Sequence, residues 1–168
     1  MGRLLLTLSV LLAFGLGLQS CDAGATRAST AIEPAAGPAS VDYARIEPAE
    51  VEALTRRFMA YDKQIRLTAE QAEIKRTALS ALPAPCCSDN SAETCCCPCN
   101  LARSVWGLSK HLIANEQRSV AEVQEAVQGW IKSINPDGYS GDVCYTGGCP
   151  KPFKQNGCGG MNGNNLII

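Results

Sequence analysis

Cysteines dominate the chemistry that this sequence could perform. Ten occur in 168 residues, and the stretch 85–100 reads P-C-C-S-D-N-S-A-E-T-C-C-C-P-C-N. Its six cysteines are Cys86, Cys87, Cys95, Cys96, Cys97 and Cys99. Thiolates this close together are ligands for soft or borderline ions, notably Zn²⁺ and Cu(I), and six sulfurs exceed what one tetrahedral site requires. The pattern therefore predicts a zinc or copper site within the stretch 85–100.

The C-terminal part of the chain adds further sulfur ligands. Cys158 and Met161 place a thiolate and a thioether on one Gly-rich segment, which is a pair suited to a soft metal. Cys144 and Cys149 flank a Tyr-Thr-Gly-Gly turn that could close locally. Cys144, Cys149 and Cys158 are therefore disulfide candidates, and they are also the expected long-range partners of the stretch 85–100.

A disulfide framework is the first alternative to a metal site. Cys86 and Cys87 would then pair across the intervening loop with a cysteine of the group 95–97. A bridge that closes a loop of this size contributes about 2.5 to 3 kcal/mol in the chain-entropy model, which is useful to a small domain. On this interpretation the protein is a disulfide-stapled interaction module.

Thiol–disulfide exchange is the second alternative. Cys96-Cys97-Pro98-Cys99 is a C-x-x-C sequence directly before a predicted helix, where the helix dipole favours a thiolate on Cys99 or Cys97. These four residues resemble the thioredoxin motif, but no βαβ pattern surrounds them. An exchange protein would use Cys96 and Cys99.

His111 is not expected to join these cysteines at a metal. It lies on the helix predicted after Cys99, on the order of 15 Å from the cysteines at the helix start. A metal–nitrogen bond spans only about 2 Å. We therefore expect His111 to be a partly exposed residue near the C-terminal end of that helix.

Other functional classes find little support. The formal net charge is −1, which provides no electrostatic basis for binding nucleic acid. The acidic residues lie on predicted solvated faces, no serine has the setting of a nucleophile, and no Gly-rich loop follows a strand to hold phosphate. The chain is therefore more typical of a binding protein than of an enzyme.

Apolar residues three and four positions apart predict the helices that would hold the cysteines. The predicted segments are 48–65, 68–82, 101–113 and 119–134. Thr68 with Gln71, and Ser119 with Glu122, have the spacing of capping boxes. We therefore expect an all-α fold: a small four-helix assembly over 48–134, with the Cys-rich stretch 85–100 as its inter-helix joint.

The remainder of the predicted organisation is irregular. Residues 135–168 form a loop-rich tail of Gly, Asn and Pro that cannot build its own core. Trp106 and Trp130 are expected in the helical core. The narrow apolar stripes could instead pack against a coiled-coil partner, although the helices are short for that arrangement.

The N-terminal residues predict export. Arg3 precedes an apolar run that is too short to span a membrane comfortably, so residues 1–20 are typical of a signal peptide. Leu18-Gln19-Ser20-Cys21 resembles a bacterial lipobox, which implies cleavage before Cys21 and lipidation of its sulfur. Residues 21–47 then have the composition of a disordered tether, which would also give reach to a protein partner.

A lipobox, a tether, and a helix that ends in proline before clustered cysteines resemble the bacterial lipoproteins named for a Pro-Cys-Tyr-Cys-Gly-Cys motif. The similar residues here are Pro85-Cys86-Cys87 and the later group 95–99. That family has no well-defined function, so the resemblance implies only a lipid-anchored protein of the bacterial cell envelope. With the cysteine pattern, it predicts a membrane-tethered lipoprotein that binds or handles zinc or copper on the extracytoplasmic side.

Overall fold

The computed structural model describes residues 41–140, 142, 144, 147 and 149–168. The predicted signal peptide, the predicted lipidation site Cys21 and the tether as far as residue 40 lie outside these residues. Within the described part of the chain, no helix is long and apolar enough to cross a membrane.

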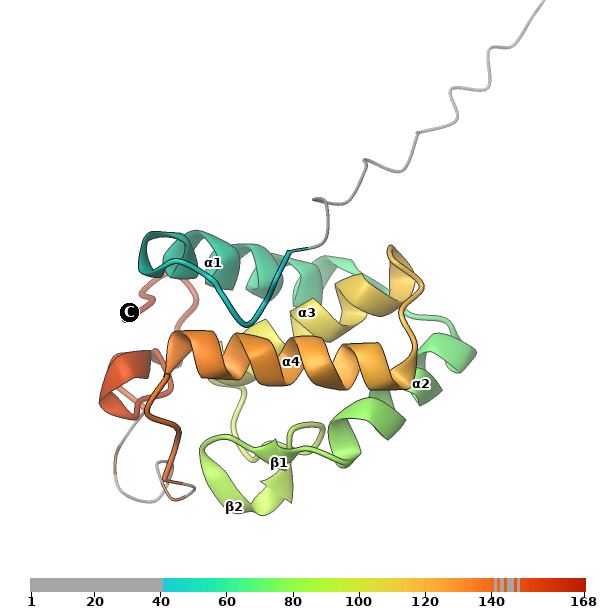
Figure 1. Cartoon of the computed structure of the whole chain (residues 1–168). Coiled ribbons are helices and arrows are strands. Elements are labelled where there is room, and N and C mark those ends of the chain that lie inside the picture. Colours follow the sequence, from blue (N-terminus) through green and yellow to red (C-terminus); the bar gives the residue numbers. More distant parts are fainter. Residues whose placement is uncertain (1–40, 141, 143, 145–146, 148) are drawn as a thin grey trace, which may run out of the picture. The chain divides into compact units, whose positions relative to one another are not determined.

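The described residues form four helices, a small hairpin and one 3₁₀ turn (Figure 1). In chain order these are α1 (Pro48–Gln64), α2 (Ala69–Ser80), β1 (Pro83–Ala84), β2 (Cys87–Ser91), α3 (Asn100–Ala114), α4 (Val120–Ile134) and η1 (Phe153–Gln155). The prediction of a helical protein is therefore confirmed, with each helix within a few residues of its expected bounds.

Local sequence accounts for the helix starts. Thr68 accepts a hydrogen bond from the Gln71 backbone N–H at 3.2 Å, and the Gln71 side chain accepts from the Thr68 N–H at 3.1 Å. The same reciprocal capping box joins Ser119 and Glu122 at the start of α4. Each box satisfies backbone donors that the first turn of a helix leaves unpaired.

Helix α3 lies at the centre of the assembly and contacts the other three helices. Leu101, Leu108 and Leu112 are buried on it, and Trp130 of α4 is fully buried beside it. The Trp130 ring meets Phe58 of α1 edge to face, with ring centroids 5.0 Å apart. Burial of these aromatic and aliphatic side chains supplies the main hydrophobic stabilisation of the fold.

Gly107 sets the distance between α1 and α3. A Cβ atom at this position would lie 1.7 Å from the backbone oxygen of Phe58 and 2.9 Å from the backbone nitrogen of Asp62. The two helix backbones are therefore in direct contact at Gly107, and no residue with a side chain fits there without moving them apart.

The first described residues pack on the helices. Ser133 donates a hydrogen bond to the Tyr43 carbonyl at 2.6 Å, and the Tyr43 ring lies 6.2 Å from that of Phe58. Burial raises the pKa of the Tyr43 hydroxyl to about 12. Tyr43 belongs to the range 21–47 that the composition assigns to a tether, yet its ring is large enough to pack on α1.

The hairpin departs from the all-α prediction. Strands β1 and β2 pair antiparallel, with Pro83 opposite Ser91 and Ala84 opposite Cys87, and the register is irregular between Pro83 and Ala84. Two such short strands leave no periodic signal in the sequence. The hairpin turn consists of Pro85 and Cys86, so the first two cysteines of the stretch 85–100 are held at the turn and at the start of β2.

Candidate metal centre

The start of α3 receives the C-terminal tail. The first helical N–H groups have no partner within a helix. Here the Asn100 N–H donates to the Gly160 carbonyl at 2.9 Å, and the Leu101 N–H donates to the Cys158 carbonyl at 3.1 Å. These two bonds bring Cys158 of the tail against Cys99, the N-cap residue of α3.

Glycines allow the tail to make this approach. Gly159 and Gly160 have φ angles of +71° and +94°, which residues with side chains rarely adopt. A Cβ at Gly159 would also lie 2.4 Å from the ring of Phe153. Phe153 is only 1% exposed and is the main apolar anchor of the tail.

Asn100 positions the tail beside the cysteines, and its sequence context does not predict this role. It is fully buried, and its amide donates to the carbonyls of Gly159 at 2.8 Å and Asn162 at 3.1 Å. An asparagine at the first position of a helix is unremarkable in the sequence, because these partners are about sixty residues away. The side chain fixes the tail on both sides of Gly160.

Contacts with α2, α3 and the residues that follow α2 also fix the stretch 85–100. The Ala92 N–H donates to the Leu82 carbonyl at 2.8 Å, and the Trp106 indole donates to the Ala92 carbonyl at 2.8 Å. Lys75 of α2 forms an ion pair with Glu93. The loop between β2 and α3 is therefore fixed to α2 and α3 before it reaches the second group of cysteines.

The cysteines gather into three groups of three within the described residues. The groups are Cys86, Cys99 and Cys158 (the buried triad), Cys144, Cys149 and Cys158 (the tail triad), and Cys96, Cys97 and Cys144 (the outer triad). In each triad the Sγ atoms lie within 4.8 Å of one another. Cys158 belongs to two triads, and Cys144 also belongs to two.

Individual sulfur distances suit a shared metal ion. Cys86 and Cys95 are 3.6 Å apart at Sγ, Cys96 and Cys144 are 3.5 Å apart, and Cys97 and Cys144 are 3.4 Å apart. Thiolates bound tetrahedrally at about 2.3 Å from one ion lie about 3.8 Å from each other. The sulfurs are thus close to the spacing that one ion would impose and well beyond the length of a disulfide bond, about 2.05 Å.

Cys144 has more sulfur neighbours than a disulfide can use. Its Sγ lies 3.4 Å from that of Cys97, 3.5 Å from that of Cys96 and 3.7 Å from that of Cys86. Its backbone N–H also donates to the Cys86 carbonyl at 3.1 Å. A disulfide can join Cys144 to one of these sulfurs only, whereas a thiolate can bridge metal ions among all of them.

Hydrogen bonds within the sulfur groups lower the pKa of Cys99. Hydrogen bonds from the thiols of Cys158, Cys86 and Cys95 lower the pKa of Cys99 far below its ordinary value, although burial opposes this. The Ala102 N–H contributes as well, donating to the Cys99 sulfur at 3.5 Å. Cys99 therefore occupies the N-cap position, where oxygen side chains are usual, and the hydrogen bonds to its sulfur favour the thiolate form.

The same hydrogen bonds favour the protonated forms of the neighbouring thiols. Donation to Cys158, Cys95 and Cys99 raises the pKa of Cys86. For Cys95, the hydrogen bond from Cys86 lowers the pKa, but Cys99 and burial outweigh it and the value rises to about 12. A metal ion that replaced these shared protons would supply the positive charge that buried thiolates need.

Three predicted ligands, Cys87, Cys95 and Met161, lie outside the three triads. Cys87 is buried at the start of β2, and its sulfur accepts a hydrogen bond from the Asn90 amide at 3.2 Å. Met161 is 44% exposed and lines a shallow surface pocket together with Cys149. Cys95 lies beside the buried triad, with its Sγ 3.6 Å from that of Cys86. The other predicted cysteine ligands belong to the triads: Cys86, Cys96, Cys97, Cys99 and Cys158.

The C-x-x-C sequence is divided between two triads. Cys99 belongs to the buried triad and has no exposed surface, whereas Cys96 belongs to the outer triad and is exposed. The structure thus groups each of the two cysteines with residues far away in the sequence. Sequence proximity alone suggested that they act together.

The expected partial exposure of His111 is wrong. Its side chain is 8% exposed, and its ring stacks on Tyr61 with centroids 4.5 Å apart. Its Nδ1 accepts from the Asn115 amide at 2.9 Å and its Nε2 lies 3.2 Å from a Glu116 carboxylate oxygen. Burial lowers the pKa of His111, and Glu116 offsets this in part. The triads do not include His111, and its ring partners explain why it is buried.

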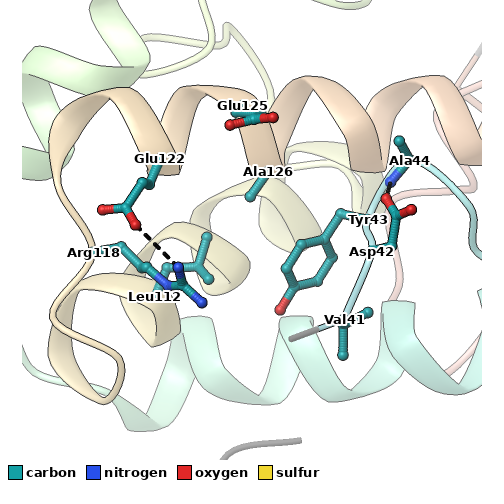
Figure 2. A pocket seen from close by; sticks show the side chains of 9 residues that line it. All are labelled: Val41, Asp42, Tyr43, Ala44, Leu112, Arg118, Glu122, Glu125 and Ala126. Atoms are coloured by element: carbon teal, nitrogen blue, oxygen red, sulfur yellow. Dashed lines mark hydrogen bonds and ion pairs between the residues drawn. The ribbon is translucent and has the colours of Figure 1, made fainter. Parts of the chain in front are cut away.

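A separate pocket lies between the first described residues and α4 (Figure 2). Its volume is about 280 Å³, and Tyr43, Leu112 and Arg118 are among its lining residues. Arg118 is already paired with Glu122 at 3.0 Å and with Glu116 at 3.1 Å, so its charge is compensated within the chain. The pocket contains no cysteine and is distinct from the sulfur groups.

Comparisons with known proteins identify no relative: no protein-family model, no curated protein and no solved structure matches this chain. The geometry of the cysteines is therefore the basis for assigning a function.

Proposed function

We propose that this protein binds or handles a soft or borderline metal ion, Zn²⁺ or Cu(I), through its grouped cysteines. The observation that carries the proposal is the position of Cys144, whose sulfur lies within 3.7 Å of three other sulfurs. This arrangement suits thiolate coordination and does not define a pairing for disulfides. The loop-rich stretch 85–100 and the tail 135–168 are, in this proposal, the two halves of the ligand scaffold.

The proposal includes anchoring of the protein to a membrane by a lipid on Cys21. The support is the sequence Leu18-Gln19-Ser20-Cys21 after an apolar run, followed by a segment of tether composition. Exchange of Cys21 for Ala should release the protein from the membrane fraction of a bacterial host. Retention of the variant in that fraction would contradict the lipid anchor without affecting the metal proposal.

Metal analysis and a thiol count on the same sample test the metal function. The full chain, purified without chelator, should carry zinc or copper at near-stoichiometric level and contain fewer than four disulfides. Mass spectrometry of the alkylated, non-reduced protein gives the disulfide count. A metal-free protein with four disulfides would overturn the proposal and favour a stapled interaction module.

Thiol–disulfide exchange has less geometric support. An attacking thiolate must reach its substrate, and reactive cysteines are therefore partially exposed. Cys99, the cysteine whose pKa is lowered, is fully buried behind the tail. Substitution of both Cys96 and Cys99 by Ser should accordingly lower the metal content. Dithiol reactivity that is present in the wild type and lost in this double variant would show instead that thiol–disulfide exchange is the function.

A further inference from the structure

The three triads are joined through two shared sulfurs. Cys158 links the buried triad to the tail triad, and Cys144 links the tail triad to the outer triad. Thiolates have more than one lone pair and can bridge two soft ions, so a shared sulfur does not force two sites to compete. A series of separate mononuclear sites would show no such sharing.

The number of sulfurs in each triad indicates the kind of ion. Three thiolates in a plane around one ion, each at about 2.3 Å from it, are about 4 Å apart, which is compatible with sulfurs that lie within 4.8 Å. Cu(I) is a soft d¹⁰ ion that accepts three thiolates, whereas Zn²⁺ in a structural site takes four ligands. The triads contain only cysteines, with no His or carboxylate to favour a harder ion.

We propose that the triads together hold a trinuclear Cu(I)–thiolate cluster in which Cys144 and Cys158 are the bridging ligands; this inference rests on the proposed metal-binding function. The remaining triad members, which are Cys86, Cys96, Cys97, Cys99 and Cys149, are terminal ligands. Cys95, at 3.6 Å from Cys86, lies on the edge of the buried triad.

Loss of a bridging ligand breaks two triads, whereas loss of a terminal ligand breaks one. Exchange of Cys144 for Ser breaks the tail and outer triads together, and exchange of Cys158 for Ser breaks the buried and tail triads together. Exchange of Cys96, Cys99 or Cys149 for Ser breaks one triad only. The geometry therefore predicts two classes of variant, which a mononuclear site would not produce.

The experiment is a Cu(I) titration of the full chain under reducing, anaerobic conditions, with a competing Cu(I) chelator and native mass spectrometry. The wild-type protein should bind three Cu(I) ions, with few molecules carrying one or two. The Cys144→Ser and Cys158→Ser variants should bind a single ion, and Cys96→Ser and Cys149→Ser should each bind two. X-ray absorption of the loaded wild type should show copper–copper scattering beside the sulfur shell.

Cys99→Ser is the variant in which folding is best protected. Serine is a favoured N-cap residue, so its hydroxyl can accept the Ala102 N–H in place of the sulfur. This variant should keep the far-UV circular dichroism of the wild type and bind two ions. It therefore separates the loss of a ligand from the loss of the fold.

The titrations distinguish a failure of the cluster from a failure of the proposed metal-binding function. Binding of one ion by the wild type, with Cys144→Ser no more impaired than Cys96→Ser, would overturn the cluster and leave the proposed metal-binding function in place. Binding of Zn²⁺ in preference to Cu(I) under competition would overturn the assignment of the ion. A folded protein that binds neither ion would overturn both the cluster and the proposed function.

Discussion

Cys99 combines two roles at a single residue. Its sulfur accepts the Ala102 N–H at the start of α3, and it also contacts the thiols of the buried triad. Serine, threonine, aspartate and asparagine are the usual N-cap residues because their oxygens accept this bond. Because the N-cap residue of α3 is a cysteine, its sulfur belongs both to the start of this helix and to the buried triad. The backbone of α3, which packs in the core, therefore also sets the position of the Cys99 sulfur.

At His111 we expect a pH-dependent loss of stability that is independent of the cysteines. Burial lowers the pKa of the native histidine below its ordinary value of 6.5, and the groups that face it are Glu116, Arg57 and Tyr61. Below pH 6.5 the unfolded chain binds a proton that the native chain does not. The free energy of unfolding should therefore fall as pH decreases from 6.5 toward the native pKa. Above pH 6.5, His111 should contribute no pH dependence to the stability.

Urea unfolding between about pH 5 and pH 8, compared for the wild type and His111→Phe, measures this effect. Phenylalanine retains the stacking on Tyr61 and does not titrate, and the cysteines contribute equally to both proteins. The wild type should lose stability relative to the variant only on the acid side. A difference that stays constant across the range would show that His111 is not a buried neutral histidine.

Asn100 should matter to both stability and metal retention. Exchange for Ala removes two hydrogen bonds from α3 to the tail, although the carbonyls of Gly159 and Asn162 keep their backbone donors. A typical hydrogen bond contributes about 0.5–1.5 kcal/mol to stability. The same change frees the tail near Cys158 and should speed the transfer of metal to a competing chelator. Asn165→Ala, which removes an exposed amide from the same segment, is the control. Equal behaviour of the two variants would contradict this role.

At the scale of elements, the contact between α1 and α3 is the most sensitive to substitution. Gly107→Ala would place a Cβ 1.7 Å from the Phe58 carbonyl oxygen, so one of two helix backbones must move. We expect a loss of roughly 3 kcal/mol or more, or failure to fold. Gly129→Ala, whose nearest backbone contact would be 3.0 Å, should change stability by less than about 1 kcal/mol. Thermal unfolding of both variants tests this order, and similar values would contradict it.

The elements differ in how far the sequence predicts them. The helices were predictable because their periodicity and the capping pairs Thr68/Gln71 and Ser119/Glu122 are local. The hairpin of β1 and β2 was not, because it is too short for a pattern. The contact at Gly107 was missed for a different reason: it depends on a backbone fifty residues away, and a glycine inside a helix is ordinarily only unfavourable.

The candidate site shows the same division between local and long-range information. The identity of the cysteines and the tail's proximity to the stretch 85–100 could be expected from composition and from the tail's lack of its own core. The sharing of Cys144 and Cys158 could not, because it depends on backbone hydrogen bonds between distant segments, from Leu101 to Cys158 and from Cys144 to Cys86. Likewise His111 is buried because Tyr61, on a separate helix, provides a surface for its ring.

For the whole molecule, the ligands come from three separate segments of chain, 86–99, 144–149 and 158, so metal binding and docking of the tail should be coupled. Removal of metal by a chelator under reducing conditions should increase the rate of tryptic cleavage after Lys154 by about tenfold or more, because metal that binds only the native state stabilises the docked tail.

Arg66, in the connection between α1 and α2, provides an internal control whose cleavage should not change, and the helical circular dichroism should persist. Cys158→Ser should be cleaved rapidly after Lys154 even with metal present. If cleavage after Lys154 is equally slow with and without metal, the backbone bonds to α3 suffice to hold the tail and the coupling is absent.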